Sequence, residues 1–312
     1  MASTSPVNLL TTYGPQRDAS AEPLSLAESR DYCRRLTASH YENFVVASWL
    51  LPRDLRPHFQ AVYAYCRWSD DLADEAGSPE ECLRLLDWWH HELRECYQGR
   101  LQHPVFIALR ETIDEFRIPE QPFADLLDAF RQDQLVQRYA TFDKLLDYCT
   151  RSANPVGRLV LYLGRCAKPE LIAWSDSICT GLQLANFWQD VARDWDKGRV
   201  YLPRETCDRF GCGETPWLER LATPEFRAAL AYEVDRAERY LLDGLPLVTA
   251  VTPELRGDVW LFVQGGLRIL KHIRAQEYDV WTKRPKVTKF EQLGLLLGCL
   301  WRNWRGGGER RS

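Results

Sequence analysis

Apolar residues recur with a helical period along almost the whole chain after residue 23. From residue 54 or 55 to residue 75, for example, Phe59, Val62 and Cys66 fall on one side of a helix. No segment alternates apolar and polar residues over enough positions to predict a strand, and no internal repeat is visible. The pattern therefore predicts an all-α fold, with about ten helices in a single domain.

Capping and turn residues divide this pattern into elements. Ser25 followed by Glu28 forms a capping-box sequence at the start of the first helix. Pro155 lies inside a helical pattern and predicts a kink there. The expected helices cover residues 24–38, 55–75, 80–97, 104–116, 123–139, 141–163, 169–194, 224–242, 253–277 and 288–301, with a loop at 196–203.

The ends of the chain differ in composition from its middle. Residues 1–23 are rich in Ser, Thr and Pro and are predicted to form a flexible N-terminal tail, and residues 303–312 a polar C-terminal tail. Residues 24–302 are predicted to form one folded domain, because a chain of 312 residues with 45% hydrophobic content can bury a sizeable core.

Charge and cysteine content narrow the functional classes. The net charge of −4 provides no global basic field, so no nucleic-acid partner is expected. The ten cysteines include no CxxC pair and several lie in helical patterns, which predicts reduced core residues and argues against a zinc site. Neither a signal peptide nor an apolar run of about 18 residues is visible, and the predicted location is cytoplasmic.

Two short acidic segments carry the strongest chemical signal. Asp70 and Asp74 lie four residues apart in the first segment, and Asp190 and Asp194 lie four apart in the second. Residues with this spacing share one helix face, where two like charges weaken an isolated helix by about 0.2–0.5 kcal/mol. Mg²⁺ takes oxygen ligands from one or two carboxylates and completes its shell with waters and substrate phosphates. The two pairs predict a Mg²⁺-diphosphate site between two facing helices.

The second acidic pair belongs to a polar stripe in an otherwise apolar helix. Its members follow a 3-4-4 spacing and are Gln183, Asn186, Asp190 and Asp194. Burying such groups without partners costs roughly 1–3 kcal/mol each, so the stripe needs water or a ligand. An exposed helix face is the alternative, against which the neighbouring Phe187 and Trp188 argue. The donors in the loop that follows, where a diphosphate could reach them, are Lys197, Arg199 and Tyr201.

The first acidic segment contains a basic residue as well. Arg67 precedes Asp70 by three positions and could bind a phosphate bidentately or neutralise a carboxylate. A solvated, charged helix end before a Gly-Ser-Pro turn is an equally good interpretation of this segment alone. Asp71 and Glu75 form a second pair that is offset by about 100° of helix rotation and is expected to face a different direction.

Motifs in a fixed order resemble the squalene and phytoene synthase family. Besides the two acidic segments, they are His40–Phe44 (HYENF), Tyr148–Gly157 (YCTRSANPVG) and Arg284–Val287 (RPKV), and the match covers about residues 25–300. The resemblance implies an all-α isoprenoid-synthase fold in which two aspartate-rich motifs face a central cavity. The Mg²⁺ ligands that it implies are Asp70, Asp74, Asp190 and Asp194.

The resemblance also assigns roles to residues outside the acidic motifs. Tyr148 matches the family's reactive tyrosine, whose hydroxyl would steer a proton or orient water; a buried structural phenol is the alternative. His40 stands in a segment that contacts diphosphate in the family, although the residue by itself is better interpreted as a surface or capping histidine. Phe44 could offer a ring face to a carbocation or simply pack in the core.

Departures from the family pattern point to one branch. Gln189 and Arg193 stand where the family commonly has Arg and Glu, and Tyr41 and Asn43 replace its usual serines. The surrounding strings resemble the hopanoid-associated hydroxysqualene synthases, which ionise presqualene diphosphate and quench the rearranged cation with water. No Gly-rich nucleotide fingerprint is visible for NADPH, which fits a product that retains a hydroxyl group.

Two alternatives remain open. One is a head-to-head prenyltransferase that makes presqualene diphosphate, squalene or phytoene from two prenyl diphosphates, such as farnesyl diphosphate. The other is a non-catalytic helical protein that binds a prenyl diphosphate. The C-terminal helix, with Trp301 and Trp304 beside Arg302 and Arg305, offers a surface for peripheral contact with the inner face of a membrane; a plain core helix is the alternative.

Overall fold

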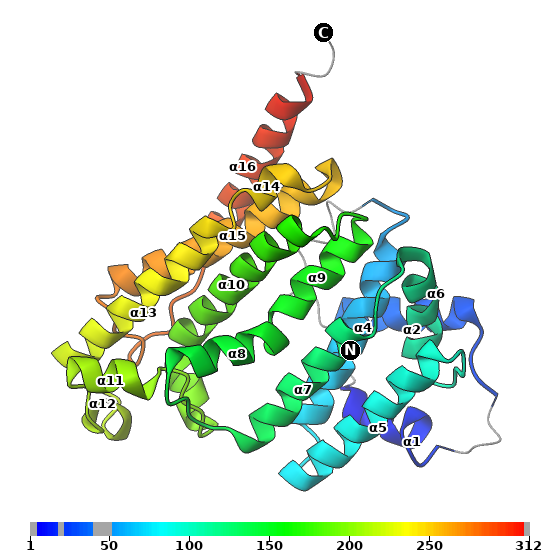
Figure 1. Ribbon diagram of the computed structural model, residues 1–312, viewed down its shortest axis with the longest axis horizontal. Helices are drawn as coiled ribbons and strands as arrows, with labels where there is room; N and C mark the ends of the chain where they lie inside the picture. Colours follow the sequence, from blue (N-terminus) through cyan, green and yellow to red (C-terminus); the bar gives the residue numbers. More distant parts are fainter. Residues whose placement is uncertain (1–4, 18–21, 40–51, 309–312) are drawn as a thin grey trace. The chain divides into compact units, whose positions relative to one another are not determined.

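The computed structural model describes residues 5–17, 22–39 and 52–308, with side chains described up to Cys299. Its regular elements are helices (Figure 1). Within these ranges the sole β-type pairing is an isolated bridge between Arg138 and Val200, so the all-α prediction is confirmed. None of the described helices is long and apolar enough to cross a lipid bilayer.

The chain divides into two compact units, which are described separately. The first, called here the N-terminal unit, comprises Met1–Leu135 and Arg158–Ala167. The second, the C-terminal unit, comprises Val136–Gly157 and Lys168–Ser312. Helix α9 (Asn154–Leu163) contributes residues to both.

The N-terminal unit is a set of helices around an aromatic core. Its elements are η1 (Pro6–Leu9), α1 (Leu10–Tyr13), α2 (Leu26–Ser39), α4 (Arg56–Asp74), α5 (Pro79–Tyr97), α6 (Pro104–Phe116) and α7 (Gln121–Leu135). Trp68 of α4 stacks on Trp89 of α5 with ring centroids 5.2 Å apart. The Tyr65 hydroxyl donates to the carbonyl of Phe123 at 2.9 Å. These contacts fix the rotation of α4 about its axis, and with it the direction in which the first acidic pair projects.

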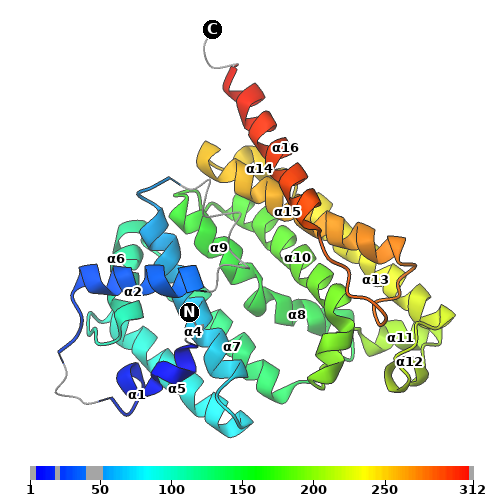
Figure 2. The same cartoon turned by 180° about the vertical axis from the view of Figure 1, so that it is seen from behind.

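The C-terminal unit is built around the long helix α10. Its elements are α8 (Phe142–Ser152), α10 (Pro169–Asp196), α11 (Arg204–Phe210), α12 (Thr215–Leu218), α13 (Pro224–Asp243), α14 (Leu247–Ala250), α15 (Pro253–Ala275) and α16 (Lys289–Gly308). Helices α10 and α13 lie side by side in both views (Figures 1 and 2). A Cβ at Gly181 would lie 2.9 Å from the backbone nitrogen of Leu241, and one at Gly244 would lie 2.7 Å from the carbonyl oxygen of Trp174. Both glycines therefore permit the close approach that positions α10.

Several elements differ from the sequence-based expectation. Residues in the predicted N-terminal tail form η1 and α1, because Ser5 bonds to the first acidic segment and the Tyr13 ring packs edge-on against Tyr32, with centroids 5.4 Å apart. The predicted helix over 141–163 is broken at Ala153 into α8 and α9, not merely kinked. The last helix runs on to Gly308, into the predicted polar tail.

Candidate functional site

The first acidic pair lies at the exposed end of α4 in the N-terminal unit. Asp74 is exposed, and the side chain of Asp70 is 47% exposed. The Nη1 of Arg67 lies 3.3 Å from the Oδ2 of Asp70, and its Nη2 pairs with Asp71 and lies 3.6 Å from Glu75. Arg67 therefore neutralises carboxylates here, which is one of the two roles that the sequence predicted for it.

Asp71 faces the interior, as its offset from Asp70 predicts. Its side chain is 1% exposed, and the Ser5 hydroxyl lies 3.0 Å from its Oδ2 and 2.5 Å from the Oε2 of Glu75. Burial raises the pKa of the Asp71 carboxyl to about 6, although Arg67 and Ser5 act in the opposite direction. Ser5 is a residue that sequence reasoning missed. The Ser-Pro pair signals a helix start, but nothing in it signals a partner 66 positions away.

The predicted polar stripe runs along α10 in the C-terminal unit. Asn186 is exposed, whereas Gln183, Asp190 and Asp194 are half-buried. The residues between them, Leu184, Phe187, Trp188 and Val191, are buried. The stripe is thus an accessible polar strip on a helix whose other faces form the core.

The RPKV segment docks directly on this stripe. Arg284 forms a bidentate pair with Asp190, in which its Nη2 donates to Oδ2 at 2.8 Å and its Nε donates to Oδ1. The bond to Asp190 raises the pKa of the Arg284 guanidinium. The Nε2 of the buried Gln189 donates to the carbonyl oxygen of Pro285 at 2.5 Å. The unusual Gln189 therefore has a structural partner, and Arg284 joins the candidate site with a role that sequence reasoning did not assign.

The loop after α10 brings basic and aromatic groups next to the stripe. Lys197 is exposed, and the backbone N–H of Arg199 donates to the carbonyl of Asp194 at 2.7 Å. Tyr201 is buried and stacks on Phe187, with ring centroids 3.8 Å apart and planes inclined by 10°. Asp194, Arg199 and Tyr201 are among the residues around a hollow of about 10 Å³, which is about the size of one water molecule.

Tyr148 belongs to the same aromatic group. It lies on α8, is 3% exposed, and its ring centroid is 6.0 Å from Tyr201, 6.2 Å from Phe187 and 5.6 Å from Tyr139. We call Tyr139, Tyr148, Phe187 and Tyr201 the aromatic cluster. It forms an apolar, electron-rich wall beside the loop that carries Arg199.

The predicted site residues thus fall into two groups, one in each unit. Arg67, Asp70 and Asp74 lie together on α4, and the remaining described candidates gather around the C-terminal part of α10, on α8 and in the loop after α10. His40 and Phe44 lie outside the described residues.

The carboxylates of the two acidic motifs differ in how readily they could bind Mg²⁺. Among the residues that the structure describes, no three His, Cys, Asp or Glu side chains converge to hold a metal ion by themselves. Two carboxylates in each motif nevertheless match the small protein share of a Mg²⁺-phosphate shell. Asp70 and Asp74 are accessible to such an ion, whereas Asp190 would have to share its oxygens with Arg284.

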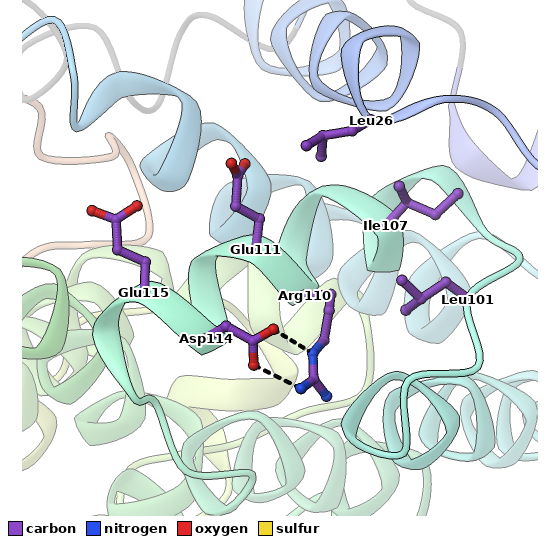
Figure 3. Close-up of a pocket in the computed structure, with 7 residues that line it drawn as sticks. All are labelled: Leu26, Leu101, Ile107, Arg110, Glu111, Asp114 and Glu115. Atoms are coloured by element: carbon purple, nitrogen blue, oxygen red, sulfur yellow. Dashed lines mark hydrogen bonds and ion pairs between the residues drawn. The ribbon is translucent and has the colours of Figure 1, made fainter.

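A larger hollow in the N-terminal unit has the wrong chemistry for a diphosphate. This open pocket of about 630 Å³ is lined by Leu26, Leu101, Ile107, Arg110, Glu111, Asp114 and Glu115 (Figure 3). Its one arginine is paired with Asp114 at 2.7 Å, and Glu111 and Glu115 are paired with Arg30 and Arg165, so the basic groups at this pocket are already neutralised by carboxylates and offer little to a diphosphate. None of the predicted site residues that the structure describes lines it.

Comparisons with known proteins place the chain among isoprenoid enzymes. A model described as squalene/phytoene synthase matches residues 37–291. A phytoene synthase of Arthrospira platensis is 30% identical over 287 residues, which cover 88% of this chain and 93% of the relative. The solved structure of squalene synthase HpnC from Alicyclobacillus acidocaldarius is 44% identical, covers 82% of this chain and 97% of its own, and has a TM-score of 0.78. A dehydrosqualene synthase structure has a TM-score of 0.80 at 26% identity and covers 89% of this chain and 97% of its own.

Proposed function

Because the chain belongs to the squalene/phytoene synthase family, whose members are enzymes acting on prenyl diphosphates, we propose that it is a hydroxysqualene synthase. The proposed substrate is presqualene diphosphate, and the products are hydroxysqualene and diphosphate, as a step of hopanoid and squalene biosynthesis. The squalene branch is supported by the 44% identity to squalene synthase HpnC, against 30% to the phytoene synthase of Arthrospira platensis. The choice of the hydroxysqualene reaction rests on the resemblance of the sequence around Gln189 and Arg193 to the hydroxysqualene synthases.

The proposed reaction balances without a reductant. The C–O bond to the diphosphate breaks, and its electron pair leaves with the diphosphate oxygen. The rearranged carbocation then forms a new C–O bond to water, which loses a proton. Mg²⁺, when bound by carboxylates of the two acidic motifs, would supply positive charge against the departing diphosphate.

The C-terminal unit contains groups that suit both the departing diphosphate and the carbocation. Arg199 and Lys197 stand in the loop that follows Asp194, and Arg284 is fixed on Asp190, so three cations lie near the stripe where a diphosphate would be bound. The aromatic cluster offers ring faces that stabilise a carbocation and restrict water. The Tyr148 hydroxyl is the proposed group for orienting the attacking water or taking its proton.

The proposed setting is the cytoplasm, with peripheral contact to the inner face of the membrane. Supporting this, all ten cysteines are free thiols, which is typical of proteins kept in a reducing compartment. The presqualene and farnesyl diphosphates that are the candidate substrates carry long apolar chains, which favours an enzyme that works at a lipid surface.

An assay with two substrates tests the proposal. Purified protein is incubated with Mg²⁺ and either presqualene diphosphate or farnesyl diphosphate, and products are identified by mass. We expect hydroxysqualene from presqualene diphosphate and no product from farnesyl diphosphate. Formation of presqualene diphosphate, squalene or phytoene from prenyl diphosphates would instead establish the prenyltransferase alternative, which the phytoene synthase relatives favour. Binding without turnover of either substrate would leave the non-catalytic alternative.

A variant tests whether the second acidic motif takes part. Asp190→Asn removes a charge from the stripe and leaves a residue of the same size, so helix content should be retained. We expect a loss of turnover of about 100-fold or more, as is usual when electrostatic stabilisation of a leaving group is removed. Asp208→Asn, on an exposed position of α11, is the control and should retain full turnover.

A further inference from the structure

Helix α16 carries a stripe of exposed apolar side chains. Phe290 is 88% exposed, Leu293 is 54% exposed and Leu297 is 58% exposed. Their spacing of three and four residues places them on one face of the helix. The sequence has tryptophan at positions 301 and 304, which continue the same register. Three large exposed apolar side chains along one face of a helix are typical of a surface that contacts something apolar.

The opposite side of α16 is attached to α15. Glu291 accepts from the Nε2 of His272 at 3.0 Å and lies 3.3 Å from the Nη1 of Arg268. Further along, a Cβ at Gly298 would lie 3.3 Å from the ring of Trp260, and Cys299 is 1% exposed. Figure 2 shows the helix passing over α15 and extending beyond α14. The helix is therefore held by one face while the apolar stripe points away from the contact.

Thr288 and Glu291 also define the start of this helix. The Thr288 N–H and hydroxyl both donate to the Glu291 carboxylate, at 2.9 and 3.0 Å, and the Glu291 N–H lies 3.3 Å from the Thr288 hydroxyl oxygen. This capping box fixes the first turn, which contains Phe290. The stripe is thus presented by a helix with a defined start and a defined orientation.

The segment that contains α16 is also rich in basic residues. Residues 283–312 contain eight Lys or Arg and two Glu, so they carry six excess positive charges, although the whole chain has a net charge of −4. Lys283, Lys286 and Lys289 are exposed just before or at the start of α16. Basic residues beside an apolar helix face favour an anionic lipid surface, because the lysines approach the headgroups while the apolar side chains enter the acyl boundary.

We propose that α16 docks on an anionic bilayer, with Phe290, Leu293 and Leu297 inserted and Lys289 at the headgroups. A second copy of the chain would also cover the apolar stripe, but two copies would bring the like charges of residues 283–312 together. The proposal makes α16 a surface anchor, in agreement with the finding that no described helix spans a bilayer. It does not depend on which reaction the protein catalyses.

Sedimentation of the full-length protein with vesicles tests this docking in the absence of substrate. We expect binding to vesicles of phosphatidylcholine with phosphatidylglycerol, weaker binding to phosphatidylcholine alone, and a decrease as salt is raised. The triple variant Phe290→Ser, Leu293→Ser, Leu297→Ser should bind the anionic vesicles at least about tenfold more weakly than the parent. The double variant Leu135→Ser, Leu218→Ser changes two leucines that are each 71% exposed elsewhere, and should bind as the parent does.

A charge variant keeps the test decisive if the triple variant is poorly folded. Lys289→Glu should weaken binding to the anionic vesicles severalfold, whereas Lys144→Glu, at another exposed lysine, should leave it unchanged. Equal binding of parent, triple variant and Lys289→Glu would overturn the proposal. So would a dimer of the parent in analytical ultracentrifugation that the triple variant converts to monomer, since the stripe would then be a contact between copies.

Discussion

Asp190 is oriented by protein groups before any ligand binds. Arg284 contacts both of its oxygens, and the same segment is fixed by the bond from Gln189 to the carbonyl of Pro285. A carboxylate held in this way loses little conformational freedom when a metal ion or a substrate arrives. Gln189 therefore acts through Arg284, as a residue that positions the segment 284–287 and does not itself face the stripe.

Replacing Gln189 tests this positioning role. Gln189→Ala leaves the buried Pro285 carbonyl without its donor, which costs about 1–3 kcal/mol of the free energy of unfolding. Urea denaturation should show this loss, and Gln292→Ala, on the exposed surface of α16, should change stability by less than about 0.5 kcal/mol. An unchanged unfolding midpoint for Gln189→Ala would contradict the assigned role.

Asp258 is a buried carboxyl that the proposed reaction does not use. It lies on α15, is 3% exposed, and neither of its oxygens has a hydrogen-bond partner within the described part of the chain. Burial raises its pKa from the ordinary 3.8 to about 7. The unfolded chain therefore releases this proton at a lower pH than the folded chain does, and the carboxyl destabilises the fold increasingly as pH rises from about 4 through 7.

The variant Asp258→Asn should remove this pH dependence. Because the amide does not ionise, we expect a higher melting temperature than that of the parent at pH 8, and a difference that shrinks towards zero near pH 4. The gain at pH 8 should be on the order of a few kcal/mol. A difference between the two proteins that is constant from pH 4 to pH 8 would contradict the raised pKa of Asp258.

Helices with clear boundary residues could be predicted from the sequence, and the others could not. Pro104–Phe116 was expected with those bounds, and Pro79–Tyr97 within one residue, because a proline begins each of them. The helices α11, α12 and α14 are four to seven residues long, which is too short for a hydrophobic period to appear. The break between α8 and α9 could not be predicted either. At the first residue of α9, the Asn154 side chain accepts a hydrogen bond from the distant Thr180 hydroxyl at 3.0 Å, and a local sequence pattern does not reveal such a contact.

The packing of α10 against α13 yields a matched pair of glycine variants. In Gly181→Ala the new methyl group would meet the Leu241 side chain at 2.8 Å and its backbone nitrogen at 2.9 Å, so we expect a loss of about 1–3 kcal/mol. Gly265→Ala places the same group in open space within helix α15, where alanine should stabilise by about 0.5–1 kcal/mol. Chemical denaturation of both variants measures the contrast. Equal effects would mean that α10 and α13 do not need this close approach.

For the whole molecule, periodicity and motif order were sufficient to predict the all-α fold and the family, and both are confirmed. The contacts that shape the site could not be predicted in the same way. Arg284 and Asp190 are 94 positions apart, and Ser5 and Asp71 are 66 apart, so neither pairing follows from a local pattern. Long-range pairings of this kind depend on how the helices pack, which helical periodicity does not specify.

The sequence predicts that the two acidic motifs act on one diphosphate, and the proposed function rests on that prediction. A double-mutant cycle tests this prediction, with Asp70→Asn in the N-terminal unit and Asp190→Asn in the C-terminal unit. The measured quantity is the affinity for inorganic diphosphate, the proposed product, in the presence of Mg²⁺. If both carboxylates stabilise the same bound anion, the first substitution reduces the binding free energy that the second carboxylate contributes. The two losses should then differ from additivity by about 0.5–3 kcal/mol.

Independent ligand sites would give a different result in the same cycle. Losses that add to within about 0.3–0.5 kcal/mol would mean that the two motifs bind separate ligands, or that only one of them binds this ligand. Repeating the cycle without Mg²⁺ distinguishes two possible origins of the coupling. Coupling that vanishes without the ion is transmitted through Mg²⁺ shared with the diphosphate, whereas coupling that persists comes from basic side chains such as Arg67 and Arg284, which pair with these carboxylates. The proposed metal-dependent reaction requires the first of these two results.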